Sequence, residues 1–95
     1  MSRDELERLG ARGEEVARFL ACDAVGETIQ DELARRREAI LGLKSSQAEE
    51  FGRLKAGLEA LEELVAALES YAESGRQARE SLRRDADTTN AGRVL

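Results

Sequence analysis

The chain has 95 residues and a formal net charge of −5, and it contains no proline, no histidine and only three aromatic residues. This length fits one domain, and the absence of proline favours an all-α fold over a β-rich one. An acidic chain repels phosphate, so nucleic-acid binding through the body of the domain is not expected.

The N-terminal segment predicts a short helix over about residues 3–21. Ser2 and Glu5 match a capping box, in which the serine oxygen accepts a free backbone N–H. Gly10 and Gly13 each weaken this helix by about 1 kcal/mol relative to alanine, and they could instead permit close approach of another helix. Its apolar positions share one stripe, at Leu6, Leu9, Val16, Phe19 and Leu20.

This stripe next meets charged residues, so the helix must break or kink near residues 22–24. Asp23 is a suitable N-cap for a second helix over about residues 24–43. Arg36 falls on the apolar side of that helix, where its stem can pack while its guanidinium reaches solvent or a glutamate. Cys22, the single cysteine, is interpreted as a small buried apolar residue. The apolar positions of the second helix are Val25, Ile29, Leu33, Ile40 and Leu43.

A third helix is predicted over about residues 47–84, after a second capping box formed by Ser46 and Glu49. It could break near residue 75, at Ser74 and Gly75. Apolar residues recur in steps of three and four, as in a coiled coil, and form a heptad seam of Phe51, Leu54, Leu58, Leu61, Val65, Leu68, Ala72 and Gly75. A tight connection makes the second and third helices antiparallel. The expected neighbours are Ile40 with Leu54, Leu33 with Leu61, and Ile29 with Val65 or Leu68.

The third helix carries a second apolar stripe beside this seam, so it needs at least two neighbours. The first helix folding back and a second protomer are alternatives that the sequence leaves open. The stripe consists of Ala60, Leu64, Ala67, Tyr71, Ala78 and Leu82. The expected fold is therefore a coiled-coil-like antiparallel helical hairpin in residues 1–84, with a short additional N-terminal helix. Residues 85–95 are expected to form an extended C-terminal tail anchored by Val94 and Leu95.

Catalytic and metal chemistry are not expected. No histidine is present to activate a nucleophile, and the glutamates of the third helix are interpreted as a solvated face. Arg35, Arg36 and Arg37 lie among acids and predict internal salt bridges. Arg76, Arg79, Arg83 and Arg84 have fewer acids nearby; Arg76, Arg79 and Arg83 share one helical face that could meet an acidic protein surface or phosphate.

Several short sequence patterns, taken in their order along the chain, resemble those of the small helical-hairpin proteins of the tailed-bacteriophage structural gene module. The patterns are Gly13-Glu14-Glu15, Phe19-Leu20, Val25 with Ile29, Phe51-Gly-Arg-Leu54, and Leu58-Glu-Ala-Leu61 leading to Gly75. The resemblance covers about residues 10–80 and implies a virion component, either a capsid accessory protein or a part of the head-tail connector. The dimensions also resemble the paired helical hairpins of bacterial secretion systems.

The sequence thus favours a non-enzymatic structural or assembly protein that acts through helix packing and a docking tail. The alternative is an acidic chaperone or regulator that masks a partner protein. We expect protein partners, by self-association or within a virion, and no cofactor, metal, small-molecule substrate or membrane. Synthesis is expected in the cytoplasm. The residues predicted to contact a partner are Leu64, Tyr71, Arg79, Arg83, Val94 and Leu95.

Overall fold

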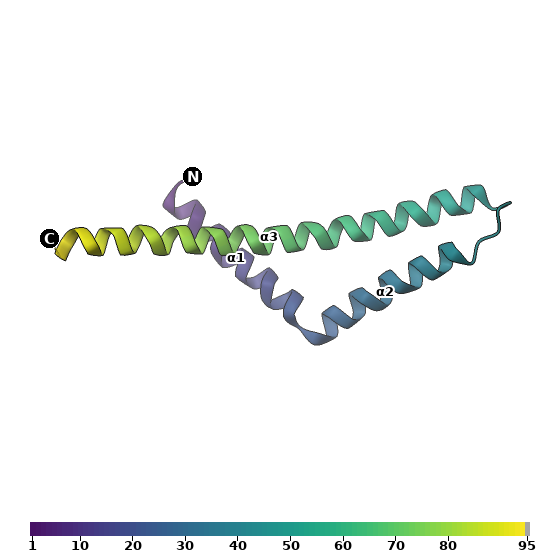
Figure 1. Ribbon diagram of the computed structural model, residues 1–95, viewed down its shortest axis with the longest axis horizontal. Helices are drawn as coiled ribbons and strands as arrows, with labels where there is room; N and C mark the ends of the chain where they lie inside the picture. Colours follow the sequence, from purple (N-terminus) through teal and green to yellow (C-terminus); the bar gives the residue numbers. More distant parts are fainter. Residues whose placement is uncertain (95) are drawn as a thin grey trace. The chain divides into compact units, whose positions relative to one another are not determined.

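The computed structural model describes the backbone of residues 1–94 and the side chains of residues 1–86. This part of the chain contains the helices α1 (Arg3–Ala21), α2 (Asp23–Leu41) and α3 (Ala48–Val94) and no strand (Figure 1). It divides into two compact units. The crossing unit combines Met1–Phe19 with α3 from Leu68 onward, and the hairpin unit is Leu20–Ala67. The predicted all-α class and helical hairpin are confirmed.

The hairpin unit pairs α2 with the first part of α3, and Figure 1 shows the two helices running antiparallel. Leu33 is the buried hydrophobic side chain of this unit, with 7% of its surface exposed. A Cβ added to Gly57 would lie 3.0 Å from Arg36 Nη1. Position 36 therefore faces position 57, between the expected pairs Ile40 with Leu54 and Leu33 with Leu61. The predicted register agrees with this contact.

The turn between α2 and α3 is longer than the sequence suggested, spanning residues 42–47 instead of about 44–46. α2 ends at Leu41, and the N–H groups of Gly42 and Leu43 donate to the Glu38 and Ile40 carbonyls at 3.0 and 3.1 Å. The Lys44 N–H donates to Gln47 Oε1 at 2.9 Å, while the Gln47 N–H donates to the Lys44 carbonyl at 2.9 Å.

α3 begins at Ala48, and the Gln47 carbonyl accepts its first helical hydrogen bond, from the Phe51 N–H at 3.0 Å. The expected capping box of Ser46 and Glu49 is wrong, because this start lies one residue too late for Ser46 to be the N-cap. The glutamine side chain closes the turn in place of the serine.

A single residue, Cys22, separates α1 from α2. Its extended backbone (φ −67°, ψ 123°) makes Cys22 the N-cap of α2, and its carbonyl accepts the Gly26 N–H at 3.0 Å. The prediction that Asp23 is the N-cap is wrong by one residue; as the first residue of α2, Asp23 still lies at the positive end of the helix dipole. Cys22 is exposed, so its predicted burial is also wrong.

The crossing unit is formed by α1 packing across α3 (Figure 1). A Cβ added to Gly13 would lie 2.5 Å from the Gly75 Cα, and one added to Gly75 would lie 2.6 Å from the Gly13 Cα. The two backbones are therefore in direct contact, and Gly10, Gly13 and Gly75 are all buried. Ala78 beside them is 3% exposed. This confirms that the glycines of α1 allow close approach of another helix.

α3 differs from its prediction at two places. It runs without a break through Gly75, because that glycine serves the contact with α1 and the packing there offsets the roughly 1 kcal/mol cost of a helical glycine. The helix also continues to Val94, so the expected extended tail from residue 85 is wrong. Aspartate, asparagine and threonine are only weakly unfavourable in helices, and propagation of an existing helix adds one hydrogen bond per residue.

Candidate functional site

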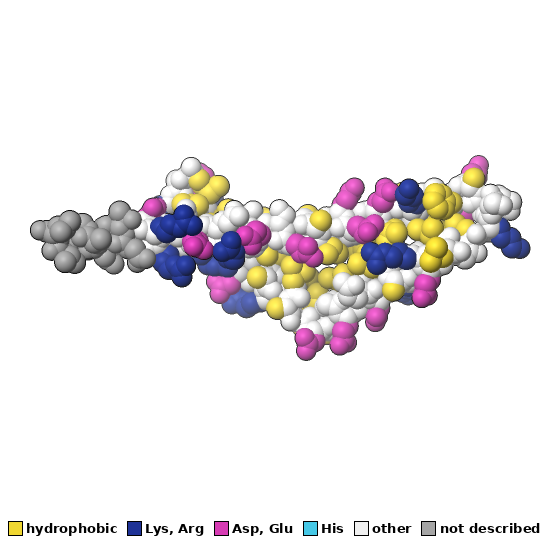
Figure 2. Space-filling model, viewed as in Figure 1, with side chains coloured by type: hydrophobic (Ala, Val, Ile, Leu, Met, Phe, Trp, Pro, Cys, Tyr) yellow, Lys and Arg dark blue, Asp and Glu magenta, His cyan; other side chains and the backbone are white. Residues whose placement is uncertain are grey.

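Large apolar side chains are exposed at the turn end of the hairpin unit, and Figure 2 shows hydrophobic side chains gathered there, on the right of the view. Leu41 is 83% exposed at the last position of α2, and Phe51 is 43% exposed in the first turn of α3. Both line a cavity of about 460 Å³, here called the tip pocket. Its other lining residues are Ile40, Leu43, Lys44, Ser45, Gln47 and Ala48.

The tip pocket is an apolar hollow with a cationic edge. The Lys55 ammonium lies 5.8 Å from the centroid of the Phe51 ring, within the range of a cation–π interaction. Lys44 lines the pocket beside Leu41. Such a hollow suits the insertion of one apolar side chain from another protein, since interface energy concentrates in buried anchor residues.

Sequence reasoning missed Leu41 and assigned Phe51 to the heptad seam. One signal could have found the pocket. Leu41 follows Ile40 directly, and adjacent residues of a helix point about 100° apart. The two side chains therefore cannot both lie on the face that packs on α3. An apolar residue off the packed face at a helix end predicts exposure at the turn.

A second exposed apolar surface lies on α3 within the hairpin unit. Leu64, one of the predicted partner contacts, is 56% exposed. Ala56, Ala60 and Ala67 are exposed at spacings of three and four residues from each other and from Leu64. We call these four residues the Leu64 face. Tyr71, also predicted to contact a partner, is 39% exposed on the part of α3 that belongs to the crossing unit.

Arg79, one of the predicted partner contacts, makes a contact within the chain. Its Nη1 donates to the Gly10 carbonyl at 2.7 Å, and a Cβ on Gly10 would lie 2.9 Å from the Arg79 Cγ. The side chain is partly buried, and its hydrogen bond joins α3 to α1 of the same chain. The sequence could not show this, because Arg79 and Gly10 are 69 residues apart.

The other arginines near the end of α3 form ion pairs with glutamates of the same helix. Arg76 donates to both Glu73 carboxylate oxygens, with the shortest bond at 2.7 Å, and to Glu80 at 3.2 Å. The hydrogen bond from Arg76 lowers the pKa of Glu73 below its ordinary value, and the same pair raises the pKa of Arg76. Both groups are exposed to solvent, so the pair contributes little to stability.

Arg83 and Arg84 lie 3.9 and 3.5 Å from the Glu80 carboxylate. Arg83 is exposed and shares a shallow cavity of about 310 Å³ with Arg76, Arg79 and Glu80. An anion in that cavity would meet the Glu80 carboxylate, which weakens the expected interaction with phosphate. The remaining predicted contacts, the side chain of Val94 and all of Leu95, lie outside the described residues.

The arginines of α2 form the internal salt bridges that the sequence predicted. Glu32 accepts from Arg35 and, at 3.0 Å, from Arg36 Nε, while Arg37 lies 3.5 Å from Glu62 of α3. The Arg36 guanidinium therefore reaches a glutamate, as expected, and its Nη1 lies close to Gly57.

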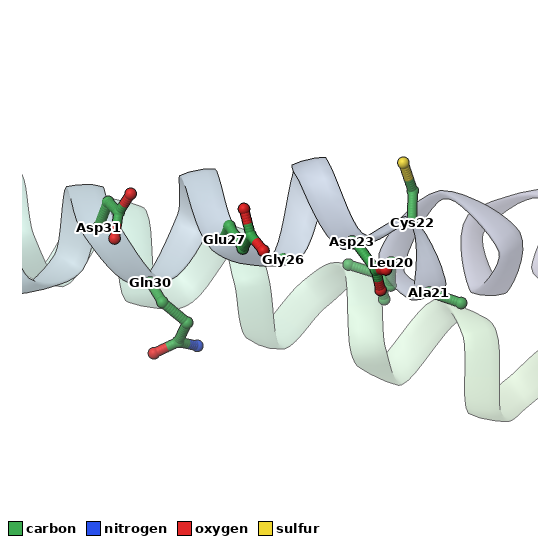
Figure 3. Close-up of a pocket in the computed structure, with 8 residues that line it drawn as sticks. All are labelled: Leu20, Ala21, Cys22, Asp23, Gly26, Glu27, Gln30 and Asp31. Carbon is green, nitrogen blue, oxygen red and sulfur yellow. The ribbon is translucent and has the colours of Figure 1, made fainter.

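A cavity of about 440 Å³ lies at the junction of α1 and α2 in the hairpin unit. In Figure 3 the Cys22 thiol and the Glu27 and Asp31 carboxylates point to one side of the ribbon, and the Gln30 amide points to the other. Asp23, Glu27 and Asp31 follow each other by four residues and form a solvated acidic row on α2. Within the described residues, no three such side chains are grouped to hold a metal ion.

No helix in the described part of the chain is both long and apolar enough to cross a membrane. No protein-family model, curated protein or solved structure matches the chain.

Proposed function

We propose that the protein is a non-enzymatic structural or assembly protein that holds other protein chains on apolar surfaces of its α2–α3 hairpin. The observation that carries the proposal is the tip pocket, where Leu41 is 83% exposed beside Phe51. Single exposed leucines are common on protein surfaces, but two large apolar side chains around a hollow of this size are typical of an interaction site.

The remainder of the hairpin unit supports this proposal. Its seam residues Leu54, Leu58, Leu61 and Val65 are half-buried against α2, so the apolar side chains needed for the fold are already covered. Leu41 and Phe51 are not required to close the hairpin, and their exposure costs hydration free energy of about 25 cal/mol per Å² that a bound chain would recover.

Photo-crosslinking in the cells that make the protein tests the proposal. A photoreactive amino acid replaces Leu41 in one variant and Ala39 in a matched control; Ala39 is also exposed, but two helical residues place it about 200° round α2. We expect a discrete protein adduct from position 41 and none from position 39. Absence of any adduct at position 41, or equal adducts at both positions, would contradict the proposal.

A place in a tailed-phage particle remains a prediction from the resemblance of the sequence. It is compatible with an extended hairpin that binds other chains, and it has its own test. Purified particles should contain the chain in a fixed ratio to the major structural protein, measured by quantitative mass spectrometry. A variant with Leu41→Gln should be depleted from those particles if the tip pocket is the attachment point.

A further inference from the structure

We propose that the Leu64 face binds an amphipathic helix of another protein, one whose apolar stripe is bordered by lysine or arginine. This inference rests on the proposed function and names the chemistry of one partner. It uses a surface separate from the tip pocket, formed by Ala56, Ala60, Leu64 and Ala67 of α3, all within the hairpin unit.

The shape of the Leu64 face fits a helix. From residue 56 to residue 67 the face extends about 16 Å along α3, which is three helical turns. Its three alanines project little from the backbone, so a partner helix can approach closely, while Leu64 provides the one large side chain to insert between residues of that helix. An extended peptide would find no free sheet edge in the described residues to pair with.

One border of this face is acidic. Glu59 follows Ala56 by three residues, and Glu63 follows Ala60 by three and precedes Ala67 by four, so both carboxylates lie beside the alanines on the helix surface. Glu59 is 4.0 Å from Lys55, a loose contact between two side chains that are both more than half exposed. Glu63 is exposed and forms no ion pair among the described residues.

The opposite border is already occupied by α2. Arg36 lies over Gly57, three residues before Ala60, and its charge is held by Glu32 at 3.0 Å. A partner helix on the Leu64 face would therefore meet Arg36, which is paired with Glu32, on one side and the exposed carboxylates of Glu59 and Glu63 on the other. Complementarity requires positive side chains along that second side.

A second copy of this chain is a poor occupant. In an antiparallel pairing centred on Leu64, the same border of both copies would meet, and Glu59 and Glu63 of each would oppose carboxylates of the other. Residues 46–73 carry seven acidic and two basic side chains, so shifting the register leaves acidic borders in contact. Like charges across a helix interface select against a partner.

Two synthetic peptides of 21 residues test the inference with the full-length chain. Both present alanine and leucine on one helical face; one has lysine at every border position and the other has glutamate. We expect the lysine peptide to bind at least tenfold more tightly by fluorescence anisotropy. Leu64→Lys should abolish this binding, and Glu59→Gln with Glu63→Gln should weaken it about tenfold.

The matched control removes the same charge elsewhere, by Glu14→Gln with Glu15→Gln on the exposed side of α1. It should leave binding within about twofold of the unmodified chain. Equal losses from both double variants, or equal affinity for the two peptides, would overturn the inference. A stable dimer that Leu64→Lys dissociates would also overturn it while leaving the proposed function intact. The proposed function fails on a different result, the absence of adducts at position 41.

Discussion

The two units of this molecule use the same long helix in opposite ways. In the crossing unit, α3 meets α1 through glycines, with Gly13 and Gly75 in backbone contact and Ala78 only 3% exposed. In the hairpin unit, α3 meets α2 through a leucine seam, and Leu41 and Leu64 remain largely exposed. Small residues bring one pair of helices into backbone contact, whereas large ones hold the other pair further apart. Each unit still exposes large apolar side chains, among them Phe19 and Tyr71 in the crossing unit.

The two units thus differ in how closely their helices approach. A glycine contact brings two backbones close and leaves little room for a third element. A seam of leucines holds two helices further apart and covers only one side of each helix. We therefore expect stability to depend on the buried residues of both units, while the proposed binding uses exposed side chains of the hairpin unit.

The largest expected effect is at Leu33, the buried leucine of the hairpin unit. Leu33→Ala should lower the free energy of unfolding by about 3 kcal/mol, since it removes apolar contacts and leaves a cavity. The same change at the exposed Leu41 should stay within about 0.5 kcal/mol. Urea unfolding followed by circular dichroism measures both. Similar losses at the two positions would mean that the tip pocket is part of the core.

The next largest effect on stability is expected at Gly13, and Gly52, which has different surroundings, should respond in the opposite direction. Gly13→Ala should destabilise the protein by about 1 to 3 kcal/mol, because its Cβ would meet the Gly75 backbone, which cannot move aside as a side chain could. Gly52→Ala, where nothing lies within 4 Å, should instead stabilise it by about 0.5 to 1 kcal/mol through helix propensity. Thermal unfolding should show shifts of opposite sign, and stabilisation by both would refute the close crossing.

A smaller loss is expected where Arg79 joins the helices of the crossing unit. Arg79→Met retains much of the aliphatic stem but removes the hydrogen bond to the Gly10 carbonyl. The free energy of unfolding should therefore fall by about 1 to 2 kcal/mol. Arg83→Met, at an exposed position 3.9 Å from Glu80, should change stability by less than about 0.5 kcal/mol. If Arg83→Met were the more destabilising of the two changes in chemical denaturation, the bond between Arg79 and Gly10 would not contribute to stability.

The smallest expected effect concerns the pKa of Glu73. Because Arg76 lowers the pKa of Glu73 from its ordinary 4.5, the pair stabilises the fold above that value and the contribution is lost as pH falls through the lowered pKa. Arg76→Gln should raise the pKa of Glu73, measured by carboxyl NMR, whereas Arg84→Gln should leave it unchanged. An unaltered Glu73 titration in Arg76→Gln would show that the two side chains do not pair in solution.

Much of the fold could be predicted from local patterns. The heptad seam, the stripe on α2 and the break near Cys22 specify three helices, and the bounds of α1 match the prediction. Helix ends were less predictable, because Gln47 closes the turn through a side-chain hydrogen bond that competes with the Ser46 capping box. The tail was misjudged because weak helix formers can extend a helix that already exists.

The candidate site was harder to predict because it depends on which side chains other helices cover. The sequence correctly placed Leu64 outside the heptad seam, and its side chain is exposed because α2 packs on the seam. Arg79 has the same spacing as Arg76 and Arg83, yet only tertiary structure places Gly10 beneath it. Periodicity finds the faces of a helix, but contacts between residues far apart in sequence decide which face remains free.

Methyl NMR with a soluble paramagnetic probe measures the exposure of these side chains most directly, because relaxation of each methyl group reports its access to solvent in the isolated protein. We expect strong relaxation of the Leu41 and Leu64 methyls and protection of the Leu33 and Ala78 methyls. If Leu41 and Leu64 were as protected as Leu33, the proposed binding surfaces of the hairpin unit would be wrong.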